Sequence, residues 1–184
     1  CNADEVTKIT PQILKSKNSC YLRIGKYGIP KNGINVEKHF FKNYNYKKII
    51  PVTKEYKQTD ITFVTTGITT PIAIEVNLKL NKNKIKSNVY HVPCINPVDI
   101  KTLKKIFLQT KKIIFIEEHY VNSGLANNLI DKAIFELNLS KLPIIERLGI
   151  PNNIFVKEYG DQESILDYYG LSKNKIIKKL KLTN

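Results

Sequence analysis

The residues most able to do chemistry are three consecutive polar side chains, Glu117, Glu118 and His119, which follow a β-branched apolar run. A histidine titrates near neutral pH and can carry a proton to or from a substrate. Neighbouring residues of a strand point to opposite faces, so the two glutamates do not form an acid/base pair. We expect one glutamate to hold the following turn. We expect His119 either to face a substrate channel or interface, or to be a structural histidine at the bend.

Arg23 is one of only two arginines in the chain and alternates with Leu22 and Ile24 in a short apolar run. In a strand, this alternation predicts a structural ion pair with a buried acid, and the alternative is a place on an interdomain surface or channel. Cys94, at the end of another predicted strand, is most simply a small core residue rather than a reactive thiol.

Neither a metal site nor a disulfide framework is predicted. The cysteines are odd in number and show no Cys-x-x-Cys spacing: Cys1, Cys20 and Cys94. The histidines stand alone on separate segments: His39, His91 and His119. Four clustered zinc ligands are therefore not expected, and free cysteines fit a reducing cytoplasm.

The formal net charge of +14 raises the question of nucleic acid as a partner. Of the 30 basic residues 28 are lysine, whereas specific base recognition relies on arginine. The lysines are scattered, so we interpret them as a solvated surface and expect no nucleic-acid partner. The longest stretch without a charge, Ile61 to Ile74, is too short to span a bilayer, so no membrane association is expected.

The hydrophobic pattern first predicts a helix over residues 4–16 and a short strand over 20–24. Residues 27–46 are rich in glycine, proline, asparagine and lysine, which is typical of a connection between two units. We place the boundary near residue 45. The chain does not begin with methionine, so residue 1 is expected to be a boundary within a longer protein.

After residue 45, predicted strands and helices alternate. The strands are residues 48–53, 61–66, 89–94, 112–116 and 143–148. The helices are residues 71–80, 97–108, 123–137, 162–168 and 172–180. This order gives βαβ crossovers, and hence an α/β fold: a three-layer α/β/α domain with a mostly parallel five-stranded sheet. No glycine-rich phosphate loop occurs, so a self-contained nucleotide site is not expected.

Four segments, in the expected order and spacing, resemble the end of the transketolase family. They are YLRIGKYGIP (21–30), DITFVTTGITTPIAIEV (60–76), VYHVPCINPVDIKTL (89–103) and IFIEEHYVNSGLANNL (114–129). The closing residues 147–176 continue the likeness. The resemblance implies that residues 1–45 are the tail of a pyrimidine-binding domain, a fragment of a second α/β domain, plus a linker. Residues 46–184 would then be the transketolase C-terminal domain.

By this resemblance the complete enzyme transfers a two-carbon ketol unit between sugar phosphates, using thiamine diphosphate and magnesium. Lys26 stands where relatives commonly place an arginine that contacts the sugar phosphate, and lysine supplies the charge without a bidentate fork. Gly124 keeps the second glycine of the family's Gly-Gly-Leu-Gly turn, although its neighbours Ser123 and Ala126 differ.

The family's Gly-Asp-Gly motif and its cofactor-protonating glutamate are not found in this sequence. We therefore assign it no catalytic, cofactor-binding or metal-binding residue, and expect no turnover from the isolated chain. The expected partners are the remaining transketolase domains or a second subunit, a second copy in a homodimer, and a sugar-phosphate substrate. The alternatives are a part of 1-deoxyxylulose-5-phosphate synthase, a 2-oxoacid dehydrogenase beta subunit, or a domain that serves only dimerisation. The Glu-Glu-His triplet favours transketolase.

Overall fold

The computed structural model describes residues 1–25, 36, 38–139, 141–152 and 159–180. Its centre is one five-stranded sheet with the order β1-β3-β2-β4-β5. The strands are β1 (Ile50–Pro51), β2 (Thr59–Thr65), β3 (Ser87–His91), β4 (Thr110–Tyr120) and β5 (Ile144–Ile150). All neighbours pair in parallel except β1, which is antiparallel to β3. The predicted mostly parallel five-stranded sheet is confirmed.

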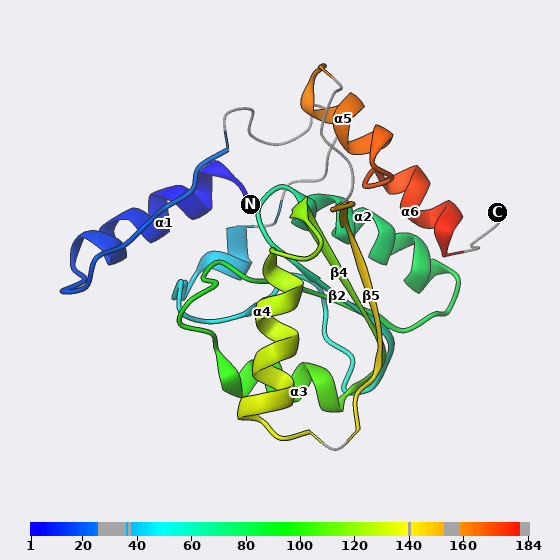
Figure 1. The fold of residues 1–184 in the computed structure, drawn as a ribbon, viewed down its shortest axis with the longest axis horizontal. Coiled ribbons are helices and arrows are strands. Elements are labelled where there is room, and N and C mark those ends of the chain that lie inside the picture. The colour runs from blue at the N-terminus through cyan, green and yellow to red at the C-terminus, as the bar shows by residue number, and fades with distance from the viewer. Residues whose placement is uncertain (26–35, 37, 140, 153–158, 181–184) are drawn as a thin grey trace.

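Helices cover both faces of this sheet, as Figure 1 shows. Successive residues of a strand point to opposite faces. In β2, accordingly, Phe63 packs into one core and Val64 into the other. The first core is completed by α2 (Thr69–Lys82), α5 (Gln162–Tyr168) and α6 (Lys173–Lys179). The second is completed by α3 (Ile100–Leu108), α4 (Leu125–Asp131) and the π-helical turn η2 (Lys132–Glu136). The three-layer α/β/α architecture is therefore confirmed.

Several predicted boundaries need correction, and the largest change is in β4, which runs from Thr110 to Tyr120 rather than over residues 112–116. β1 has only two residues: the Val52 backbone N–H still donates to Val89 O at 3.0 Å, but the Val89 N–H donates to Thr53 Oγ1 rather than to the backbone of the edge strand. Helix α3 begins at Ile100 rather than residue 97, because Asp99 is its N-cap and accepts a hydrogen bond from the Thr102 backbone N–H. Strand β3 ends at His91, so Cys94 lies in the loop beyond it.

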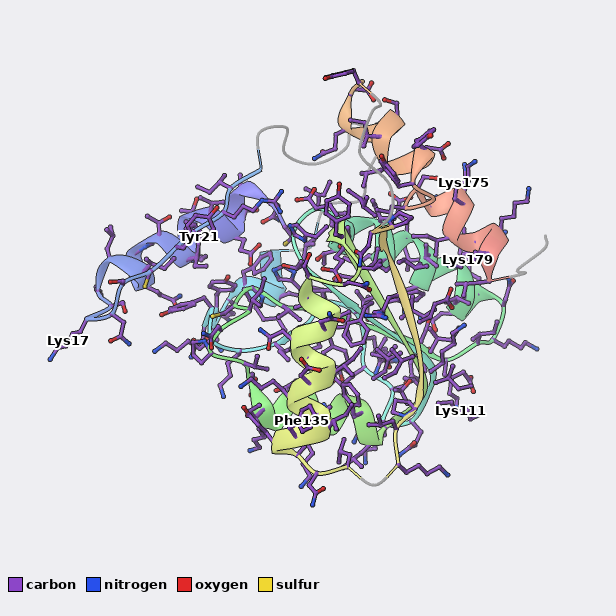
Figure 2. The ribbon with its side chains drawn as sticks, viewed as in Figure 1. Lys17, Tyr21, Lys111, Phe135, Lys175 and Lys179 are labelled. Atoms are coloured by element: carbon purple, nitrogen blue, oxygen red, sulfur yellow. The ribbon has the colours of Figure 1, made fainter. Side chains whose placement is uncertain are left out.

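The N-terminal arm, residues 1–25, contains helix α1 (Ala3–Leu14), which projects away from the sheet (Figure 1). Asn2 caps this helix by accepting from the Glu5 backbone N–H at 2.9 Å. The 3₁₀ turn η1 (Lys38–Phe41) lies against it. Figure 2 shows Lys17 at the end of the arm farthest from the sheet.

The predicted strand over residues 20–24 does not form. The arm residues after α1 have no regular secondary structure, and Tyr21 is 89% exposed. A strand requires a neighbour that accepts and donates its backbone hydrogen bonds, and none of the described residues offers one here. None of the described helices has the length and apolar character needed to cross a membrane.

Candidate site at the end of strand β4

The candidate site lies at the carboxyl end of β4, where the chain leaves the sheet for α4. The parallel strands β2, β3 and β4 end at the same edge, which is where open α/β sheets bind ligands. The ladder with β5 is irregular between Ile116 and Tyr120. Glu117, Glu118 and His119 occupy this irregular stretch.

Glu117 holds the turn into α4. Its carboxylate is buried and accepts hydrogen bonds from the backbone N–H groups of Leu125 at 2.6 Å and Ala126 at 3.2 Å. These donors belong to the first turn of the helix, whose N–H groups have no partner within the helix. The expectation that one of the two glutamates fixes this turn is confirmed.

Gly124 makes that contact possible. A Cβ atom at this position would lie 1.7 Å from Glu117 Oε2. Any side chain here would displace the carboxylate from the helix, so glycine is required by close approach rather than by backbone conformation.

Glu118 and His119 both contact Arg23 of the N-terminal arm. Arg23 Nη1 lies 3.2 Å from Glu118 Oε1 and also hydrogen-bonds His119 Nε2. Because a guanidinium only donates, His119 Nε2 is the acceptor in this contact. Nδ1 lies 3.8 Å from Glu117 Oε2. The structure thus brings together Arg23 and His119, which the sequence analysis named separately, and the acid that pairs with Arg23, Glu118, is partly exposed rather than buried.

A hollow of about 200 Å³ opens beside Glu118. Its walls are mainly apolar and come from β5, α5 and the residues after α5: Ile150, Ile165, Leu166, Tyr169 and Leu171. Such a lining suits an apolar group, with the partly exposed Glu118 as a polar contact at the margin. Lys26, the predicted phosphate contact, lies outside the described residues.

A second group of polar residues, which sequence reasoning missed, joins the arm to the sheet. His91, at the end of β3, contacts Glu5 of α1 with an Nε2 to Oε1 distance of 2.7 Å. Tyr44 donates its hydroxyl to the same oxygen at 2.8 Å, and the amino terminus of Cys1 contacts the other. The sequence gives no signal for this group, because Glu5 and His91 are 86 residues apart and follow no common motif.

Burial changes the pKa values of Glu5 and His91 in this group. Burial lowers the pKa of His91, and contact with Glu5 offsets this only in part. Burial would raise the pKa of Glu5, but the charge and hydrogen bond of His91, together with the amino terminus, hold it well below its usual value. Glu5 is therefore an anion at neutral pH, and His91 is a neutral donor to it. Burial also raises the pKa of the Cys94 thiol, which lowers its reactivity, but Cys94 is only partly buried and belongs to neither core, so the expected core position is wrong.

Neither of two hollows on the described residues offers the groups that hold a magnesium-bound diphosphate. That group needs oxygen ligands for the metal and cations for the phosphates. The hollow beside Glu118 is apolar and contains no lysine or arginine. A more open hollow of about 560 Å³, between α1 and the segment Tyr44–Lys47, has lysines but no carboxylate.

Comparison with known proteins identifies the relatives of this chain. The family model described as transketolase, C-terminal domain, matches residues 52–176. The chain is 27% identical, over 97% of its length, to a subunit of the apulose-4-phosphate transketolase of Phocaeicola vulgatus, and it covers 53% of that subunit. It is 30% identical over 124 residues to 1-deoxy-D-xylulose-5-phosphate synthase of Bacillus licheniformis, covering 67% of the chain and 19% of that protein.

Among solved structures, the fold matches one described as a split gene transketolase, an inactive beta4 tetramer. The TM-score is 0.78 at 20% identity, over 98% of this chain and 54% of that one. The chain thus spans about half the length of the relatives that it matches from end to end. On the family match over residues 52–176, this chain belongs to the transketolase family and carries its C-terminal domain.

Proposed function

We propose that this chain is the C-terminal portion of a transketolase-like, thiamine-diphosphate-dependent enzyme. In the complete enzyme it assists transfer of a two-carbon ketol unit between sugar phosphates. The observation that carries this proposal is the end-to-end match with a protein named as part of a transketolase, over 97% of this chain. We assign thiamine diphosphate and magnesium to the neighbouring domains, which is supported by the lining of the two hollows described above.

This chain contributes a surface for association and a few positioned side chains to the complete enzyme. The arm is held to the C-terminal domain in two places: by Arg23 at the end of β4, and by Glu5 at the end of β3. Arg23 lies three residues before Lys26 in sequence. We propose that Lys26 supplies a positive charge to the substrate phosphate, and that Arg23 and His119 line the channel or interface beside it.

The arm and the hollow beside Glu118 are proposed to face the polypeptide that carries the missing domains. Exposed apolar side chains on the arm, Leu14, Tyr21 and Ile24, support this assignment because a partner would remove them from water. The tail of a pyrimidine-binding domain over residues 1–45 remains our interpretation of the arm and the linker. We propose a dimer of the complete assembly.

A second candidate is a part of 1-deoxy-D-xylulose-5-phosphate synthase. It is favoured by the 30% identity to that enzyme. The match extends over 124 residues, whereas the match to the apulose-4-phosphate transketolase extends over 180. We therefore place transketolase activity first.

The test is co-expression of this chain with a polypeptide that carries the Gly-Asp-Gly domain, followed by assays with thiamine diphosphate and magnesium. Ketol transfer between sugar phosphates supports the proposal, and formation of 1-deoxy-D-xylulose 5-phosphate instead supports the second candidate. The 184-residue chain alone should give no turnover with either assay. Light scattering of the complex reports whether two copies of each polypeptide assemble.

The role of Lys26 is tested in the same complex. Lys26→Ala should raise KM for phosphorylated substrates, and Lys26→Arg should restore it, because either cation can attract a phosphate. Lys57→Ala, at an exposed position of the sheet domain, is the matched control. Unchanged kinetics in Lys26→Ala would instead favour a domain that serves only association.

A further inference from the structure

The described part of the chain holds one group of three potential metal ligands, Cys1, Glu5 and His91. The ligand atoms, one thiol sulfur, one carboxylate oxygen and one imidazole nitrogen, all lie within 4.8 Å of one another. Glu5 and His91 are buried, and the Cys1 side chain is also covered. We propose that these three side chains form a binding site for Zn²⁺ between the N-terminal arm and the sheet.

The donor set suits zinc. Thiolate, imidazole and carboxylate are the three ligand types that zinc takes in proteins, and a sulfur ligand disfavours magnesium and calcium. A thiolate and a carboxylate together neutralise the divalent charge, while the Cys1 amino terminus beside Glu5 adds one positive charge when it is protonated. This balance matters because an uncompensated charge is costly in a buried position. Three protein ligands leave a fourth position for solvent.

Two of the three ligands already have outer hydrogen-bond partners. His91 Nδ1 lies 2.9 Å from Thr70 Oγ1, which in turn lies 2.9 Å from Thr65 Oγ1. Tyr44 donates to Glu5 Oε1 at 2.8 Å. Zinc-binding histidines and carboxylates are commonly oriented by such partners, which hold the ring and fix the nitrogen that faces the metal.

Zinc would take the place of a proton between Glu5 and His91. Their contact of 2.7 Å is a direct hydrogen bond. Bonds to zinc of about 2.0–2.3 Å in a tetrahedral arrangement separate neighbouring ligand atoms by roughly 3.3 Å or more, so this contact would lengthen slightly. The imidazole keeps one proton, which moves from Nε2 to Nδ1 and points to Thr70. Cys1 releases its thiol proton to solvent, so binding one zinc ion releases one proton.

The site would fasten the arm to the C-terminal domain. Cys1 and Glu5 belong to the start of the arm, whereas His91 is the last residue of β3. Zinc binding should therefore stabilise the arm against local opening as well as the whole chain against unfolding. This consequence does not depend on the enzymatic role proposed above.

The experiment uses the full chain freed of metal, titrated with Zn²⁺ by calorimetry and with Co²⁺ by absorbance. We expect one ion per chain and a thiolate-to-cobalt charge-transfer band. Cys1→Ser should abolish that band, and His91→Gln should weaken binding by about 100-fold or more. Cys20→Ser is the matched control, because Cys20 is exposed and lies outside the group, and it should bind as the original chain does.

The proposal fails if the chain binds neither ion stoichiometrically, or if Cys1→Ser and Cys20→Ser bind zinc equally well. If a variant does not fold, X-ray absorption spectroscopy of the zinc-loaded original chain identifies the atoms bound to zinc. The absence of a sulfur ligand contradicts the proposal. A chain with one added residue before Cys1 separates the thiol from the terminal amine. Loss of binding in that chain would show that the amine, and not this side-chain set, holds the ion.

Discussion

Glu117 and Gly124 occupy complementary space, because the carboxylate of the first fills the position that a side chain on the second would take. The separation of 1.7 Å between a built Cβ and Glu117 Oε2 is far below any tolerated contact. The strand end and the first turn of α4 are therefore joined by a buried anion bound to backbone N–H groups.

Gly124→Ala should accordingly destabilise the chain strongly. The methyl group forces Glu117 away from the two N–H groups, which leaves a buried charge and two buried donors without partners. We expect a loss of about 2–4 kcal/mol in the free energy of unfolding, measured by urea denaturation. Gly25→Ala is the control, because a Cβ there meets nothing within 4 Å, and it should change stability by less than about 0.5 kcal/mol. Equal stability of the two variants would contradict the position of Glu117.

The contact of Arg23 with Glu118 should be weak but measurable. The side chain of Arg23 is 54% exposed, and exposed ion pairs contribute little to the free energy of folding. A double-mutant cycle with Arg23→Ala and Glu118→Ala should give a coupling energy of about 0.2–1 kcal/mol, falling at high salt. Zero coupling at low salt would mean that the arm does not rest on the end of β4 in solution.

The sheet and its two covered faces followed from the sequence because burial imposes a local pattern. Apolar β-branched residues, such as Ile113 and Ile114, fill both cores from one strand, and this needs only local periodicity to detect. Residues 20–24 show the limit of that method. They carry a strand pattern, yet no described segment pairs with them, because pairing depends on other residues rather than on the pattern itself.

The candidate site was predictable where its residues are consecutive and not where they are distant. Glu117, Glu118 and His119 stand out as a polar triplet after an apolar run. The contact between Glu5 and His91 depends on how the arm packs on β3, a tertiary relationship for which one sequence holds no periodic signal.

The two cysteines outside the proposed zinc site should differ in reactivity. Cys20 is exposed, whereas Cys94 is partly buried and burial raises its pKa, which lowers the thiolate fraction available for alkylation. With iodoacetamide near neutral pH, intact-mass and peptide analysis should show Cys20 modified first and Cys94 at least severalfold more slowly. Faster modification of Cys94 would contradict its packing in the loop after β3.

The buried contact of Glu5 and His91 predicts a loss of stability in mild acid. The pKa of His91 lies below its usual 6.5, so the unfolded chain takes up a proton more readily than the folded one. The stabilisation is complete above pH 6.5 and declines as the pH falls from 6.5 towards the folded pKa. The pKa of Glu5 lies below its usual 4.5, so its contribution is complete above pH 4.5 and is lost in stronger acid.

Urea denaturation of the metal-free chain at several pH values between about 8 and 5 tests this sign, since folded Glu5 stays ionised throughout that range. The slope contributed by His91 is at most about 1.4 kcal/mol per pH unit below 6.5. His91→Gln retains an N–H group that can donate to Glu5 but cannot take up a proton, so its stability should vary less with pH than that of the original chain. Tyr44 and the amino terminus, which also contact Glu5, are unchanged in this variant and provide the same background in both chains. Identical pH profiles for the two chains would mean that His91 titrates normally and is not buried against Glu5.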